Sequence, residues 1–228
     1  MKIFEVCILI FIVFMYSFGT YKRNFTWQDE FTLWQDVVIK SPQNPRAHNN
    51  LGVFYIERGL LEQAITEIKT ALALTPNFVN AHVSLGNAFA EKGLFDDALR
   101  EYREALNLKP DYGGVWVNIG NVFIKMGKLN KAIEAYKKAV KLSPYYLNAK
   151  INLALAYGMK GEYHKAISLL KEALLLDPKN ADIHFNLAVS LEKKGEIKEA
   201  REEFRRVLEL NPRDGEAKRH LDKLNSSF

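Results

Sequence analysis

Residues 79–112 read VNAHVSLGNAFAEKGLFDDALREYREALNLKPDY, and this stretch decides the fold. Apolar residues recur at helical spacing on both sides of Gly93, with Leu85 and Phe89 before it and Leu99 after it. Glycine suits the left-handed position that ends a helix, because it has no Cβ to be strained there. The stretch therefore predicts two amphipathic helices that meet at Gly93.

The same features recur every 34 residues along the chain. The repeated prolines are Pro42, Pro76, Pro110, Pro144, Pro178 and Pro212. Glycine and alanine share the spacing at Gly59, Gly93, Gly127, Gly161 and Gly195 and at Ala64, Ala98, Ala132, Ala166 and Ala200. Proline cannot continue a helix, because it lacks the N–H and clashes with the preceding turn, so each proline ends a unit. The small alanines let two helix backbones approach closely. An all-α array of helical hairpins follows.

This pattern resembles the tetratricopeptide repeat (TPR) family, whose units are 34-residue helix-turn-helix hairpins. The resemblance implies a right-handed TPR superhelix, an α-solenoid of five full repeats. The matching units are 45–78, 79–112, 113–146, 147–180 and 181–214. Two departures are modest: Val207 replaces a second-helix alanine, and only Trp116 carries the aromatic residue often seen early in the first helix.

Both ends of the array are predicted to be capped, because a terminal repeat has one face with no neighbour. Residues 22–44 read as a degenerate half repeat that acts as a capping helix, with Trp34 on its apolar face. Residues 215–228 begin like another first helix, in which Leu221 and Leu224 are apolar and most of the rest are charged. We expect this C-terminal capping helix to cover the last repeat.

The N-terminal segment is apolar and predicts a helix that anchors the chain in a membrane through residues 1–21. Residues 6–21 carry no charge, and as a helix they rise roughly 24 Å, against a hydrocarbon core of roughly 30 Å. Trp27, beside Lys22 and Arg23, favours an interfacial position for the end of the segment. The alternatives are a cleaved signal peptide and a buried first helix of the solenoid.

A second resemblance bears on the side of the membrane. The apolar segment, the Lys22–Arg23 pair and the Leu33–Trp34 pair ahead of the repeats look like the junction in polytopic membrane glycosyltransferases that end in a TPR array. Those arrays face away from the cytoplasm, so the resemblance implies an extracytoplasmic array on a single-pass anchor. The charges give opposing indications: Lys22 and Arg23 favour a cytoplasmic array, whereas Lys2 and the free amino group favour the other side.

Composition and motifs argue against catalysis. The 228 residues carry a net charge of +5, which by itself makes no case for nucleic acid, and the single cysteine excludes an internal disulfide. No phosphate-binding loop, dinucleotide fingerprint, zinc-protease helix or nucleophile elbow occurs, so we expect no enzyme activity and no cofactor. His48, His82 and His184 occupy equivalent positions, which in neighbouring repeats lie about 10 Å apart, and this does not favour one shared metal site.

The first helices are expected to line a concave groove that accepts an extended peptide. Asparagine recurs there, and an amide both donates and accepts hydrogen bonds, so a row of amides can pair with a peptide backbone. The predicted groove residues are Asn50, Asn87, Asn118, Asn121, Asn152, Asn186, Val83, Val117, Ile151 and Phe185. The row is similar to the asparagine ladder in the TPR superhelix of the O-GlcNAc transferase family. The alternative is that these amides bond locally between helices.

We therefore predict a non-enzymatic protein-interaction scaffold or adaptor whose partner is a protein or peptide. The alternative function is an accessory or detached substrate-binding TPR portion of a membrane glycosyltransferase. Self-association through an incompletely covered terminal repeat is a third expectation. Residues 113–146 hold six lysines against one glutamate, which predicts a basic convex side formed by their second helix, either solvated or in contact with an acidic partner or anionic lipid.

Overall fold

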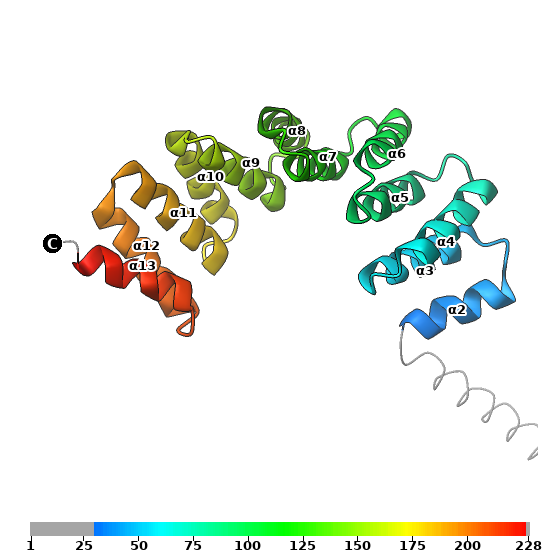
Figure 1. Cartoon of the computed structure of the whole chain (residues 1–228), viewed down its shortest axis with the longest axis horizontal. Helices are drawn as coiled ribbons and strands as arrows, with labels where there is room; N and C mark the ends of the chain where they lie inside the picture. The colour runs from blue at the N-terminus through cyan, green and yellow to red at the C-terminus, as the bar shows by residue number, and fades with distance from the viewer. Residues whose placement is uncertain (1–29, 227–228) are drawn as a thin grey trace, which may run out of the picture. The chain divides into compact units, whose positions relative to one another are not determined.

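The computed structural model describes residues 30–226, which form helices and no strand (Figure 1). The helices are α2 (Glu30–Lys40), α3 (Pro45–Glu57), α4 (Leu61–Leu74), α5 (Val79–Glu91), α6 (Phe95–Leu108), α7 (Gly113–Lys125), α8 (Leu129–Leu142), α9 (Leu147–Met159), α10 (Tyr163–Leu176), α11 (Ala181–Lys194), α12 (Ile197–Leu210) and α13 (Gly215–Ser226). The all-α prediction is confirmed for this part of the chain. The chain forms two compact units, Met1–Ala105 and Leu106–Phe228.

Glycine turns separate the helices of each hairpin. Gly195 has φ 91° and caps α11 in the left-handed conformation, a region that strains residues with a Cβ. The four glycines at equivalent positions also have positive φ. Polar side chains cap the N-termini of some first helices. At α11 the Asn180 Oδ1 accepts from the Ile183 N–H at 3.2 Å, and at α13 the Asp214 Oδ1 accepts from the Ala217 N–H at 2.9 Å.

Small residues pack the hairpins closely together in both units. In Met1–Ala105, Ala64 is fully buried where α4 packs against α3 and α5, and Ile68 fills the space beside Gly52. In Leu106–Phe228, Ala166 and Ala200 are fully buried in a continuous core. First helices of successive repeats also touch, as α3 touches α5, α7 touches α9 and α9 touches α11. First-helix side chains of neighbouring repeats therefore lie next to one another.

The C-terminal end of the array is covered by α13. The Phe204 ring of α12 is fully buried and stacks on the His220 ring of α13, with ring centroids 5.0 Å apart and planes 17° apart. The Nδ1 of His220 lies 2.7 Å from the Glu192 Oε2, and the Arg201 guanidinium donates to the carbonyl of Leu224. These contacts hold α13 against α11 and α12, the two helices of the last full repeat.

At the other end, α2 packs against α3. The Phe31 ring lies edge-on to the Tyr55 ring at 5.6 Å, and the Arg58 guanidinium lies 4.0 Å from the Phe31 ring centroid. Residues 1–21, on which the predicted anchor or signal peptide falls, lie outside the described residues. Among the helices of residues 30–226, none is both long and apolar enough to cross a membrane.

Candidate functional site: asparagines of the first helices

The predicted groove residues do not share one environment. Asn121 is exposed, and most of the others are half-buried on their helices. Val117 is the exception: only 4% of it is exposed, and it packs in the core with α8 and α9 residues. Val117 therefore presents almost no surface to a ligand. Phe185 packs edge-on against the Phe204 ring, with centroids 5.7 Å apart, and also contacts the His220 ring of α13. Part of its surface is therefore covered by its own fold.

In Leu106–Phe228, three helices meet at the Asn121 amide. The Tyr136 hydroxyl of α8 donates to the Asn121 Oδ1 of α7 at 2.7 Å. The Asn152 Nδ2 of α9 donates to the same oxygen at 3.3 Å. Two donors on one oxygen fix the orientation of the amide, which leaves its Nδ2 as the outward group. That Nδ2 makes no hydrogen bond to any residue of 30–226, and the side chain is exposed.

Met1–Ala105 contains a related tyrosine–asparagine pair. The Tyr102 hydroxyl of α6 donates to the Asn87 Oδ1 of α5 at 2.7 Å. Asn50 accepts a long bond of 3.4 Å from the neighbouring Asn49 amide, and Ser84, at the register of Asn50, is buried. Asn87 and Asn121 thus follow the alternative interpretation of the sequence, in which the amides bond locally between helices. In each of them the amide oxygen accepts the local hydrogen bond.

The tyrosine partners are a signal present in the sequence that the groove prediction did not use. Asn87 and Asn121 occupy equivalent positions in two repeats. In each of these repeats a tyrosine follows fifteen residues later, at Tyr102 and Tyr136. In the three other repeats, both positions are apolar: Val53 with Ile68, Leu155 with Leu170, and Val189 with Phe204. Asparagine and tyrosine therefore occur together or are both absent. This is expected because a buried tyrosine hydroxyl without a hydrogen-bond partner would destabilise the fold.

Asn186 stands apart from this network. Its backbone carbonyl accepts from the Ser190 hydroxyl at 2.8 Å, but its amide makes no hydrogen bond within the described residues.

Half-buried Ile151 and exposed Leu155 lie on the same helix as Asn152 and add apolar surface to α9. Among the predicted groove residues, Asn121 and Asn152 are in direct hydrogen-bond contact.

Burial keeps both tyrosines neutral. Removal from water disfavours the phenolate, so burial raises the pKa of Tyr136 to about 12. Burial also raises the pKa of Tyr102 well above its ordinary value of 10.0, and the Glu91 carboxylate adds to the rise. Each hydroxyl therefore remains a hydrogen-bond donor to its asparagine throughout the neutral range.

We expect these tyrosines to make the fold sensitive to alkali. A raised native pKa contributes stability that is fully present below pH 10 and is lost as the pH rises through the native pKa, about 12 for Tyr136. The free energy of unfolding should therefore fall more steeply above pH 10 in the wild type than in the Tyr102→Phe, Tyr136→Phe double variant. Urea titrations across this range measure the slopes. Tyr145→Phe, at an 83% exposed position, is the control, and equal slopes for all three proteins would contradict the expectation.

The equivalent histidines have a structural role instead of forming one centre. The Nδ1 of His48, His82 and His184 lies 2.6, 2.9 and 2.6 Å from the Oε2 of Glu67, Glu101 and Glu203, respectively. The Nε2 of the same rings lies 3.0, 2.9 and 3.0 Å from the carbonyl oxygens of Pro42, Pro76 and Pro178. Each imidazole thus connects the second helix of its own repeat to the preceding proline. Histidine and glutamate are both missing from the third and fourth repeats.

Residues 30–226 contain no group of three or more histidine, cysteine, aspartate or glutamate side chains placed to hold a metal ion. The carboxylates nearest the histidines are engaged by them, as described above.

The repeated hairpin, the positive-φ glycine between its helices and the buried alanines at each joint define a TPR protein. The chain belongs to the family of the cytochrome c-type biogenesis protein H TPR domain, whose model matches residues 95–218, more than half of the chain. A second TPR repeat model matches residues 54–93. Both models describe TPR domains, and neither describes a catalytic domain.

Solved structures share this fold. PilF of Pseudomonas aeruginosa has a TM-score of 0.72 and 23% identity, over 81% of this chain and 84% of that one. YrrB, described as a TPR protein with an unusual peptide-binding site, has a TM-score of 0.63 and 20% identity, over 83% and 97%. MamA of Desulfovibrio magneticus RS-1 has a TM-score of 0.65 and 24% identity, over 75% and 97%. No curated protein matches the chain. The fold is that of a protein-interaction scaffold.

Proposed function

We propose that the chain is an adaptor that binds an extended peptide segment along its first helices. The observation that carries the proposal is the Asn121 amide, whose oxygen is held by Tyr136 and Asn152 and whose exposed Nδ2 is left to donate. A donor held in one orientation loses little conformational entropy when a ligand binds. A peptide carbonyl is the matching acceptor, and it is present whatever the peptide side chains are.

Apolar neighbours supply the selectivity in this proposal. Leu155 is 41% exposed and Ile151 is half-buried on α9, on the same helix as Asn152. An apolar peptide side chain placed there would remove its own surface and that of Leu155 from water. The fold shared with YrrB, whose description includes a peptide-binding site, is consistent with this use of the array.

The test is peptide binding by a variant that lacks both amides. Linear peptides with capped ends are selected against the full chain from a random display library, and their affinities are measured by fluorescence anisotropy. Asn121→Ala with Asn152→Ala should weaken binding about tenfold or more, the loss expected for one or two hydrogen bonds whose partners stay desolvated. The matched control is Asn77→Ala with Asn130→Ala, which removes two exposed amides from other surfaces.

Unchanged affinity in a groove variant with wild-type circular dichroism would contradict the proposal.

The same peptides, made with a free carboxyl terminus, should bind no better. Lys150, on the same first helix as Asn152, is only 8% exposed, and its ammonium pairs with the Glu172 carboxylate at 2.5 Å. A clear preference for the free terminus would instead indicate a carboxylate clamp.

The glycosyltransferase-associated alternative rests on the N-terminal junction, part of which lies outside the described residues. Neither matching family model describes a glycosyltransferase. The peptide-binding adaptor is therefore the function we propose, because it alone has a side-chain arrangement to support it.

A further inference from the structure

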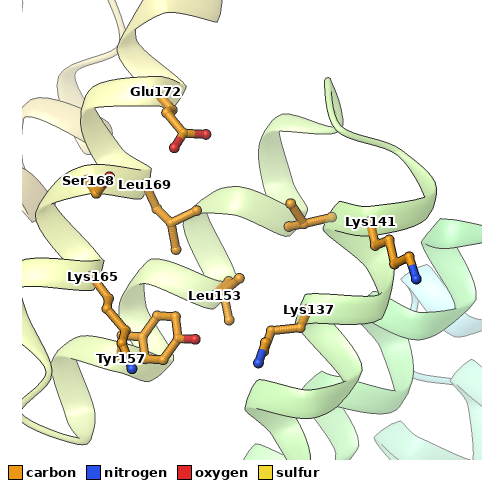
Figure 2. Close-up of a pocket in the computed structure, with 9 residues that line it drawn as sticks. Lys137, Lys141, Leu153, Tyr157, Lys165, Ser168, Leu169 and Glu172 are labelled. Atoms are coloured by element: carbon orange, nitrogen blue, oxygen red, sulfur yellow. The ribbon is translucent and has the colours of Figure 1, made fainter.

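A cleft of about 400 Å³ lies between α8, α9 and α10 in Leu106–Phe228, and no asparagine lines it (Figure 2). Its walls are α8, which contributes Lys137 and Lys141, and α10, which contributes Leu169. Figure 2 shows Leu153 and Tyr157 of α9 between these two walls. The volume is at the lower end of the range of ligand-binding pockets.

The apolar surface of this cleft comes from a local change in the repeat. Three other repeats hold a glutamate at the position of Leu169, and a first-helix histidine binds it. In this repeat Lys150 replaces the histidine, and its ammonium pairs with Glu172, one helical turn beyond Leu169. Leu169 therefore faces the cleft without a polar partner, and Val140, Leu153 and the Tyr157 ring complete an apolar floor.

The charges at the rim are unbalanced. Glu172 is neutralised by Lys150, and Lys165 is 2.5 Å from the Glu162 carboxylate, which raises the pKa of that lysine. Lys137 and Lys141 are exposed and make no ion pair with any described residue. They lie one helical turn apart on α8, which carries four lysines against a single glutamate. Two uncompensated positive charges thus border an apolar floor.

We propose that this cleft is a second docking site, for an acidic protein segment that projects one large apolar side chain. The apolar side chain fills the space between Val140, Leu153 and Leu169, where it is removed from water. Aspartate or glutamate residues beside it pair with Lys137 and Lys141. A recessed floor between three helices fits a projecting side chain better than it fits a planar layer of lipid headgroups. None of the predicted groove asparagines lines the cleft, so we expect the adaptor to hold two partners at once.

The probe for this site is a capped peptide in which one tryptophan is flanked on each side by aspartates. Binding to the full chain is measured by fluorescence anisotropy at low salt, because the ion pairs are screened at high salt. Lys137→Glu with Lys141→Glu should weaken binding about tenfold or more. Leu169→Gln, which leaves the charge unchanged, should weaken it as well. Asn121→Ala with Asn152→Ala should leave it unaffected.

The matched control is Lys171→Glu with Lys179→Glu, which makes the same change in net charge at two exposed lysines outside the cleft. This control should bind the peptide nearly as well as the wild type. An equal loss in both lysine variants would overturn the proposal, since it would reflect only the total charge. Equal binding of a peptide with serine in place of tryptophan would also overturn it. So would binding of phosphatidylserine vesicles, lost in the Lys137, Lys141 variant, without any binding of the peptide.

Discussion

Gly120→Ala is expected to lower the local free energy of unfolding by about 1–3 kcal/mol. The added Cβ would lie 2.3 Å from the Tyr136 Cε1, 2.6 Å from its Cδ1 and 2.8 Å from its Cζ. The Tyr136 ring is 3% exposed, and its hydroxyl is bonded to Asn121, so the ring has little room to retreat. The gain in helix propensity from glycine to alanine, about 1 kcal/mol, offsets only part of the overpacking. Hydrogen exchange across α7 and α8 measures the effect, because repeat arrays unfold in parts.

Gly158→Ala provides a matched control of opposite sign. Gly158 also lies within a first helix, α9, but a Cβ there would meet no atom within 4 Å. We expect this variant to be more stable than the wild type by up to about 1 kcal/mol. The chain itself suggests a rescue, because Ala154 is paired with Leu170 and Ala188 with Phe204 at the equivalent positions. Tyr136→Leu should therefore restore part of the stability lost by Gly120→Ala. Equal effects of the two glycine substitutions would contradict this account.

Phe204→Ala is expected to cost about 3–5 kcal/mol in the C-terminal part of the array. The ring is fully buried, stacks on His220 at 5.0 Å and meets Phe185 edge-on at 5.7 Å. Removing it leaves a cavity at the joint between α11, α12 and α13, so α13 should lose most of its protection against hydrogen exchange. Loss of the cap would also expose the apolar face of the last repeat, which should increase self-association in light scattering.

Phe204→Leu separates the cavity from the loss of aromatic stacking. The fourth repeat has leucine, Leu170, at this position and buries it almost completely. The leucine variant should therefore cost less than about 1.5 kcal/mol and keep α13 protected. If Phe204→Ala left the exchange of α13 unchanged, the stacked ring would not be what holds the cap.

The groove was only partly predictable. Asparagines at helical positions identify amides on the first helices, but which atom of each amide remains available depends on groups fifteen or more residues away. Tyr136 and Asn152 reach Asn121 from two other helices, and Val117 turned out to lie in the core. The joint occurrence of asparagine and tyrosine at equivalent repeat positions is the sequence signal for the Tyr102 and Tyr136 bonds.

The helices, their turns and the repeat array could be predicted from the sequence. These features follow from local rules, because a residue's backbone freedom and the 3.6-residue apolar period act within a few positions, as at Gly93 and Leu85. The pairing of the polar groups and the position of the cleft became apparent only from the folded structure. The Asn121 amide, the histidine–glutamate contacts and the cleft beside Leu169 depend on side-chain directions across packed helices, which are set by how closely and in what register the helices approach.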